Sequence, residues 1–330
     1  MKYQMLGKSG ITVSQVAFGA WGLGGGNVWS GMSFDAEYVR DLLSYAFDCG
    51  INYIDTAPVY GIGTSERILG KALEGMRDRF VLQSKCSLNW RGTGRFEYER
   101  DGYNVMRDHH AEAVRKDVEE SLERLNTDYL DSLVVHRISK DVPVEETMGE
   151  LLKMKQEGKI RAILISNSRP EDFLAYAQCG ETDGVQEKFS LLSSENSDYF
   201  ETLKKHKAIF QVYGSLEQGI LGNPKVLADR FGAGDIRSSS KWVREPYRAK
   251  LLEMYSSMED ICEKYGCSFA NLMQAWILKQ YDLISLLTGF RRRETIADTC
   301  RVFDIALSDK DAEYMERLAQ KVRNAEQQKV

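Results

Sequence analysis

The chain has 330 residues, enough for one large α/β domain or two ordinary ones, and its 43% hydrophobic and 28% charged residues are typical of a globular protein. A net charge of −5 argues against a general nucleic-acid-binding protein, because such proteins carry a basic excess. The first residues lack the apolar segment of a secretory signal and no apolar run is long enough to span a bilayer, so we expect a cytoplasmic protein that binds neither nucleic acid nor membrane.

The predicted elements begin with a hairpin and then alternate between strand and helix. Residues 2–6 and 11–15 form the hairpin around a "GKSG" turn. Eight short apolar runs then predict strands ending near Phe18, Ile54, Ser84, His136, Ile165, Glu187, Val212 and Leu287. Apolar residues at helical spacing predict helices at Asp35–Asp48, Ser65–Leu73, Ala111–Leu125, Val144–Glu157 and Tyr199–Lys205.

This alternation favours a (β/α)8 TIM barrel with the N-terminal hairpin as a plug at one end, and an open doubly wound sheet is the alternative. The number and spacing of the strands favour the barrel. The stretch between Tyr213 and Ile284 is long and polar before it becomes helical, so a long loop after strand seven is expected to act as a lid. No linker divides the chain, and we therefore predict a single domain over residues 1–330.

The six cysteines are scattered without the spacing of a disulfide framework or a zinc site. They are Cys49, Cys86, Cys179, Cys262, Cys267 and Cys300. We expect reduced thiols and no metal site.

Four polar residues lie where three consecutive predicted strands end. The second strand leads into Asp55 and Tyr60, the third delivers Lys85, and the fourth delivers His136. Catalytic groups of a (β/α)8 barrel sit at the carboxyl ends of its strands, so the four can converge on one site. Each also has an ordinary interpretation: a turn aspartate, a packing tyrosine, a solvated lysine and a core histidine. Their occurrence together favours catalysis.

These four side chains suit the reduction of a carbonyl. A tyrosine hydroxyl has a pKa of about 10, which a nearby ammonium is expected to lower. Asp55 could keep Lys85 charged and oriented, and His136 could hydrogen-bond a substrate oxygen. Tyr60 would then protonate the alkoxide that forms when a carbonyl accepts a hydride, and that hydride must come from a cofactor.

Over nearly its whole length the chain resembles the aldo-keto reductase superfamily. The motifs that carry the resemblance are "GINYIDTAPVYGIGTSERILGKAL", "SLERLNTDYLDSLVVHR", "GKIRAILISNS" and "VYGSLEQGILG". The catalytic tetrad of that superfamily falls on Asp55, Tyr60, Lys85 and His136. Within it, "VYGSLEQGILG" and "GGNVWSG" are most similar to bacterial reductases associated with inositol catabolism.

The resemblance implies a nicotinamide cofactor extended across the strand ends, without a Rossmann fold. Residues 22–26, "GLGGG", agree with this, because they open no helix and so do not form a dinucleotide fingerprint. The implied cofactor-binding residues are Ser166, Asn167 and Gln186 for the carboxamide, Tyr213 for stacking on the nicotinamide, Gly214, Ser215, Leu216 and Gln218 for the pyrophosphate, and Gly289, Arg291 and Thr295 for the adenosine end.

The sequence departs from the superfamily pattern at several of these sites. Leu164 and Ser168 replace a common glycine and phenylalanine, and Thr295 and Thr299 stand where side chains that contact the 2′-phosphate and adenine are common. The arginines at 291–293 could compensate, because arginine suits phosphate, although they could also form a solvated face. We predict a preference for NADP(H) over NAD(H).

Trp21, Trp29 and Trp90 lie in predicted strand-end loops and are expected to form an aromatic rim around the substrate. Such a rim would suit a polyol, a sugar or an aromatic aldehyde, and the pattern names no single compound. Two other functions remain possible from the sequence: a non-catalytic, cofactor-binding auxiliary protein with the same fold, and a barrel lyase that uses Lys85 as a Schiff-base nucleophile.

Overall fold

The computed structural model describes residues 1–330 except 27–31, 229–230, 232–234 and 329–330, and it contains a closed barrel of eight parallel strands. Around the ring the strands follow the order β10-β11-β12-β13-β3-β4-β5-β9. Their bounds are β3 Val16–Gly19, β4 Tyr53–Asp55, β5 Val81–Cys86, β9 Leu130–Val135, β10 Ile160–Ser166, β11 Gly184–Lys188, β12 Ile209–Tyr213 and β13 Ile284–Gly289. The predicted (β/α)8 barrel is confirmed, and the open sheet is excluded.

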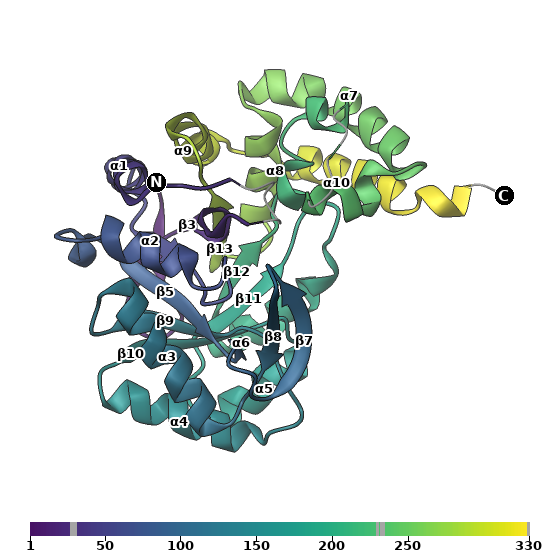
Figure 1. Cartoon of the computed structure of the whole chain (residues 1–330). Coiled ribbons are helices and arrows are strands. Elements are labelled where there is room, and N and C mark those ends of the chain that lie inside the picture. Colours follow the sequence, from purple (N-terminus) through teal and green to yellow (C-terminus); the bar gives the residue numbers. More distant parts are fainter. Residues whose placement is uncertain (27–31, 229–230, 232–234, 329–330) are drawn as a thin grey trace.

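Helices surround the ring of strands, with α7 and α10 packed together on one side (Figure 1). They are α1 Ala36–Asp48, α2 Thr64–Ala72, α3 Ala111–Leu125, α4 Val144–Gln156, α5 Pro170–Cys179, α6 Tyr199–His206, α7 Tyr247–Tyr265, α8 Phe269–Leu278, α9 Arg293–Cys300 and α10 Asp309–Arg323. The five predicted helices agree with α1, α2, α3, α4 and α6 to within a residue at each end. No described helix is long and apolar enough to cross a membrane.

Helix α3 shows why the apolar spacing works as a predictor. Val114 and Val118 are buried in the core between helices and strands. Arg115, one position further along, faces outward and pairs with Glu150 and Glu157 of the neighbouring α4 region. Helix α3 thus buries one apolar stripe and is joined to α4 through a charged side chain beside that stripe.

The N-terminal hairpin closes one end of the barrel. Strands β1 (Tyr3–Met5) and β2 (Thr12–Ser14) are antiparallel, and Leu6 and Val13 pack with residues from the barrel interior. Gly7 has φ +57°, and a Cβ at this position would lie 2.2 Å from the carbonyl oxygen of Asp183. The hairpin therefore approaches the barrel too closely for a side chain there, and the active-site end is the opposite one.

A small antiparallel sheet follows β5 and was not predicted. It consists of β6 (Leu88–Asn89), β7 (Arg95–Arg100) and β8 (Tyr103–Arg107), in the order β6-β8-β7. The tip between β7 and β8 is Asp101–Gly102, with φ values of 51° and 81°. An Asp-Gly pair with two positive φ angles is the turn that two-residue hairpins favour. The sequence "YERDGYNV" therefore carried a hairpin signal that the alternation of longer elements obscured.

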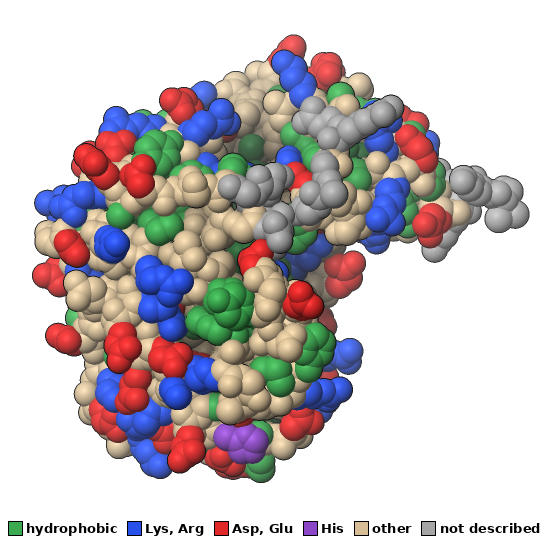
Figure 2. Space-filling view, viewed as in Figure 1, with side chains coloured by type: hydrophobic (Ala, Val, Ile, Leu, Met, Phe, Trp, Pro, Cys, Tyr) green, Lys and Arg blue, Asp and Glu red, His purple; other side chains and the backbone are tan. Residues whose placement is uncertain are grey.

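Short 3-10 helices make up much of the long segment after β12. Among the described residues the 3-10 helices are η1 Trp21–Gly24, η3 Arg77–Arg79, η4 Glu195–Asp198, η5 Glu217–Gly219, η6 Pro224–Ala228, η7 Ile236–Ser239, η8 Lys241–Val243, η9 Arg301–Asp304 and η10 Ala325–Gln328. Residues 229–230 and 232–234 of the predicted lid lie outside the described residues. Acidic and basic side chains are interspersed over the face shown in Figure 2, in keeping with the small net charge.

Candidate active site

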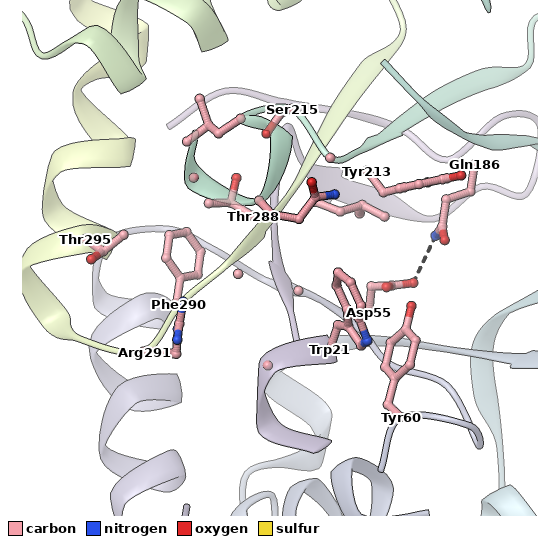
Figure 3. A pocket seen from close by; sticks show the side chains of 18 of the residues that line it. Trp21, Asp55, Tyr60, Gln186, Tyr213, Ser215, Thr288, Phe290, Arg291 and Thr295 are labelled. Atoms are coloured by element: carbon pink, nitrogen blue, oxygen red, sulfur yellow. Dashed lines mark hydrogen bonds between the residues drawn. The ribbon is translucent and has the colours of Figure 1, made fainter. Parts of the chain in front are cut away.

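A cavity of about 910 Å3 lies at the carboxyl ends of the barrel strands. Its lining includes a residue at the end of, or directly after, six of the eight strands: Gly19, Asp55, His136, Ser166, Tyr213 and Gly289. Gln186, in the middle of β11, lines it as well. Figure 3 shows Tyr60, Asp55 and Gln186 at one end of this cavity and Arg291 and Thr295 at the other. The cavity thus extends from the candidate catalytic group to the candidate adenosine site.

Asp55 and Lys85 form a buried ion pair beneath the cavity. The Nζ atom of Lys85 lies 2.5 Å from Oδ1 of Asp55 and also donates to the carbonyl oxygen of Thr56 at 2.9 Å. Burial lowers the pKa of Lys85, and the charge of Asp55 opposes that shift. The described residues that line the cavity include Asp55 but not Lys85. Lys85 therefore does not line the cavity and can influence it only through its charge and its bond to Asp55, which argues against its use as a Schiff-base nucleophile.

Buried glutamines complete the support of Asp55. Its Oδ1 atom accepts hydrogen bonds from Nε2 of Gln83 at 2.7 Å and Nε2 of Gln186 at 2.9 Å, and both glutamines also donate to Gln211 (Figure 3 shows the Gln186 bond). The β4–β5 register aligns Asp55 with Gln83, and the β11–β12 register aligns Gln186 with Gln211. A polar layer across the barrel thus fixes the carboxylate. The glutamines of "VLQSKC" and "IFQVY", polar residues within apolar strands, were the available signal for this layer.

Tyr60 lines the cavity next to the other members of the tetrad. Its ring centroid lies 5.1 Å from Nζ of Lys85 and 6.0 Å from the ring of His136, which it meets edge-on. Burial and, secondly, the charge of Asp55 raise the pKa of Tyr60 well above its ordinary value. The expected lowering of this pKa is therefore wrong, because desolvation of the phenolate and the charge of Asp55 outweigh the opposing charge of Arg100. The phenol holds its proton at neutral pH.

His136 directly follows β9 and presents a neutral imidazole to the cavity. Burial, followed by the charges of Lys85 and Arg137, lowers the pKa of His136 well below its ordinary value. Its buried Nδ1 atom has no hydrogen-bond partner among the described residues. The ring is thus uncharged and carries one N–H, which suits a contact with a substrate oxygen.

Three residues predicted to bind the nicotinamide end are joined by hydrogen bonds. The hydroxyl of Tyr213 donates to Oδ1 of Asn167 at 2.7 Å, and Nδ2 of Asn167 donates to the carbonyl oxygen of His136 at 2.8 Å. Ser166 donates to the backbone of Gln186 at 2.6 Å. Asn167 has φ +52°, a conformation that asparagine tolerates better than most residues. The cluster ties the end of β10 to the histidine and to the aromatic ring at the end of β12.

Ser168, which replaces a phenylalanine common in the superfamily, anchors the backbone next to Asn167. Its backbone N–H and its hydroxyl both bond to Oε1 of Glu187, at 2.9 and 2.8 Å, and the hydroxyl also meets the phenol of Tyr199 at 2.7 Å. A phenylalanine could make neither side-chain bond. Burial raises the pKa of Glu187 to about 7, against the lowering effect of the two Ser168 bonds.

This raised pKa predicts a specific pH dependence of stability. Because the folded-state pKa of about 7 exceeds the ordinary 4.5, the folded chain binds more protons than the unfolded chain between those values. Glu187 therefore costs stability as pH rises through that window. We expect Glu187→Gln to gain stability over the wild type by about 1–3 kcal/mol at pH 8 and by little at pH 5. Denaturant unfolding of both proteins at the two pH values measures this, and an equal difference at both would contradict it.

The far end of the cavity carries two of the three adjacent arginines. Arg291, Arg292 and Thr295 line it, whereas Arg293 pairs with Asp41 away from it. Burial lowers the pKa of Arg291, as do the charges of Arg237 and Arg292. Of the three adjacent arginines, Arg291 and Arg292 therefore belong to the cavity wall and Arg293 to the solvated surface. The remaining predicted cofactor residues Gly214, Ser215, Leu216, Gln218 and Gly289, and also Thr299, line the same cavity.

The three tryptophans separate in the structure. Trp21 lines the cavity, with its ring centroid 6.4 Å from that of Tyr60. Trp90 packs against the cluster of Val59 and Leu88 instead, with Arg124 over its ring, and is not among the described residues lining the cavity. The expectation that Trp90 forms part of the rim is therefore wrong, and Trp29 lies outside the described residues.

The residues present fit a dinucleotide. The cavity offers an aromatic ring and amide groups at the tetrad end, a backbone turn at Gly214 with φ +69°, and arginines at the other end. These groups match a nicotinamide, a pyrophosphate that needs close backbone approach, and a charged adenosine end. Several lining residues were not predicted, among them Tyr98, Arg100, Arg137, Thr288 and Phe290. The first two come from the hairpin that sequence reasoning missed.

Comparison with known proteins identifies relatives over almost the entire chain. The model of the aldo/keto reductase family matches residues 15–320. An NADH-specific methylglyoxal reductase of Escherichia coli is 34% identical over 325 residues, covering 97% of this chain and 99% of the relative. An aldo-keto reductase of Bacillus subtilis is 32% identical, covering 88% and 86%. The structure of a glycerol dehydrogenase from Gluconobacter oxydans superposes with a TM-score of 0.84 at 30% identity, covering 96% and 94%.

Proposed function

The chain belongs to the aldo/keto reductase family, and from that premise we propose that it reduces an aldehyde or ketone, or oxidises the corresponding alcohol or sugar, with a nicotinamide cofactor and with Tyr60 as general acid and base. The observation that carries this proposal is the single cavity in which Tyr60, His136 and Asp55 meet the Ser166–Asn167–Tyr213 cluster. We further propose that residues 1–330 act as one domain in the cytoplasm. The six free cysteines support that compartment.

The side chains divide the work of this reaction. The bound cofactor supplies the hydride. Tyr60 keeps its proton until the carbonyl oxygen gains negative charge, because its phenol is the neutral species in the site. His136 donates a hydrogen bond to the same oxygen and so fixes the position of the carbonyl. Lys85, held by Asp55, places a positive charge behind the ring that becomes a phenolate once the proton has left.

This proposal is preferred over the two alternative functions. A non-catalytic auxiliary protein would not need the tetrad, yet all four members lie together. A lyase would need Lys85 to reach the substrate, yet Lys85 is fully buried beneath Asp55. A panel of aldehydes, ketoses and polyols with NADPH and NADH, followed by absorbance of the reduced cofactor, tests the proposal. Cofactor binding without any turnover across the panel would favour the auxiliary protein.

His136 should orient the substrate without affecting the cofactor. We expect His136→Ala to lower kcat/KM for carbonyl substrates by about 100-fold, as removal of a transition-state hydrogen-bond donor does in other enzymes. The affinity for NADPH should change little. His110→Ala is the matched control, because that histidine is exposed at the start of α3. Steady-state kinetics and a cofactor titration measure the two effects. If His136→Ala lost only cofactor binding, His136 would be a structural residue and not one that orients the substrate.

We propose a preference for NADPH, supported by Arg291 and Arg292 in the cavity wall, although the E. coli relative is NADH-specific by name. Only NADPH presents a 2′-phosphate, so Arg291→Ala should weaken NADPH binding by about tenfold and NADH binding much less. Arg293→Ala is the control, because Arg293 pairs with Asp41 outside the cavity. Fluorescence titrations with both cofactors measure this. Equal weakening of both would place Arg291 on a part of the cofactor that they share.

A further inference from the structure

Arg100 is a cation at the substrate end of the cavity that the proposed reaction does not use. It is the last residue of β7, next to the Asp101–Gly102 tip, and it lines the cavity together with Tyr98, Tyr60 and His136. Its guanidinium carbon lies 5.2 Å from the ring centroid of Tyr98. The ring supports the flat guanidinium from one side and leaves its N–H groups available in the plane.

Arg100 differs from the arginines around it in having no anionic partner. Arg91 pairs with Asp117 and Glu120, Arg95 lies near Asp141, and Arg107 and Arg137 share Glu97. The Arg100 side chain makes no hydrogen bond or ion pair with any residue in the described part of the chain. A guanidinium that lines a cavity and has no carboxylate partner of its own can bind the carboxylate or phosphate of a ligand.

The charge of Arg100 reaches the catalytic groups. It is one of the causes that lower the pKa of His136, and it opposes the rise in the pKa of Tyr60. Arg137, which directly follows His136, lines the cavity as well. The acidic groups nearby are committed elsewhere: Asp55 pairs with Lys85, and Asp101 lies against Gly26 at the hairpin tip. The substrate end of the cavity therefore has a positive wall.

We propose that the substrate of this enzyme carries an anionic group, a carboxylate or a phosphate, that pairs with Arg100 while its carbonyl lies against Tyr60 and His136. This inference rests on the proposed function and specifies the class of its substrate. Arg137, already shared with Glu97, contributes long-range attraction. The cofactor's phosphates belong at the opposite end of the cavity, near Ser215 and Arg291, so Arg100 is not needed for them (Figure 3).

Matched pairs of substrates test the inference and separate the two anions. Succinic semialdehyde is compared with butanal for the carboxylate, and glyceraldehyde 3-phosphate with glyceraldehyde for the phosphate. The wild type should show a higher kcat/KM for the charged member of at least one pair. Arg100→Met should lower kcat/KM for that member by about 10- to 100-fold more than for its neutral partner, mainly through KM, and leave the cofactor affinity unchanged. Arg95→Met, which removes an exposed arginine from the same strand, should change neither.

The outcomes distinguish failure of the inference from failure of the proposed function. Equal losses for charged and neutral substrates, a wild type that does not favour charge in either pair, or a loss of cofactor affinity in Arg100→Met would overturn the anionic substrate while leaving the reductase intact. No turnover of any carbonyl would contradict the reductase itself. In that case, calorimetric titration with succinate and glycerol 3-phosphate tests the anion site separately. Binding of either anion that Arg100→Met abolishes would support an anion site at Arg100. Failure of the wild type to bind either anion would overturn it.

Discussion

Tyr60→Phe should bind NADPH as the wild type does and lose carbonyl reduction by about 100- to 10,000-fold, the range that positioned general acids contribute. The substitution removes one oxygen and keeps the ring that packs edge-on to His136 and lies beside Lys85. The cavity therefore keeps its shape, and the hydrogen bonds that join Ser166, Asn167 and Tyr213, the proposed nicotinamide-binding residues, do not involve Tyr60. Only the proton donor is lost.

Two measurements establish that result. Steady-state kinetics give the loss in turnover, and quenching of protein fluorescence gives the cofactor affinity of the same preparation. Tyr314→Phe serves as the control, because it removes a phenol hydroxyl from the exposed surface of α10. A Tyr60→Phe enzyme within a few-fold of wild-type turnover would exclude Tyr60 as the acid.

Lys85→Met should have the second-largest effect, because it damages both turnover and stability. Lys85 is fully buried and is the only cation that pairs with Asp55 among the described residues. Removing one partner of a buried ion pair leaves an uncompensated charge, at a cost of about 3–5 kcal/mol. Turnover should also fall, since no ammonium then stabilises the phenolate that Tyr60 becomes.

A second variant separates the two effects. In Lys85→Met with Asp55→Asn the unpaired carboxylate is replaced by a neutral amide, so the free energy of unfolding should recover substantially while activity stays low. Lys250→Met is the control for losing a lysine that pairs with a glutamate, Glu253, at the surface, and its cost should stay below about 1 kcal/mol. Unfolding in denaturant and turnover of the same samples measure both effects. If Lys85→Met retained wild-type activity, the role given to the ammonium would be wrong.

The fold could be predicted because its signal repeats along the chain. Each barrel strand is a short apolar run such as "LVV" before His136, and each flanking helix buries residues at helical spacing, as Val114 and Val118 do in α3. Polar residues at strand ends then point to the site, because a parallel barrel brings these ends together. The tetrad could be located on that basis, and its members do lie together.

The features of the site that could not be predicted from the sequence depend on contacts between residues that are distant along the chain. Gln83, Gln186 and Gln211 come from three strands and form one layer only when the barrel register aligns them. The pKa of Tyr60 depends on how deeply the phenol is buried and on its distance from Asp55, and spacing along the chain reveals neither. Trp90 was predicted to lie at the rim because it follows a barrel strand, whereas the region after that strand forms the sheet of β6, β7 and β8, and the indole packs against Val59 and Leu88.

The most direct test of the account is whether hydride passes from the nicotinamide to a carbonyl carbon in this cavity. NADPH and NADH that carry deuterium at the transferable position are incubated with the enzyme and the carbonyl that it turns over best, and the alcohol is analysed by mass spectrometry. The account predicts one deuterium on the carbinol carbon with the wild type and almost no labelled alcohol with Tyr60→Phe. Each cofactor is used in two forms, with deuterium on one or the other face of the nicotinamide. Alcohol without deuterium from both forms, or equal labelling of the alcohol by the wild type and Tyr60→Phe, would contradict the account.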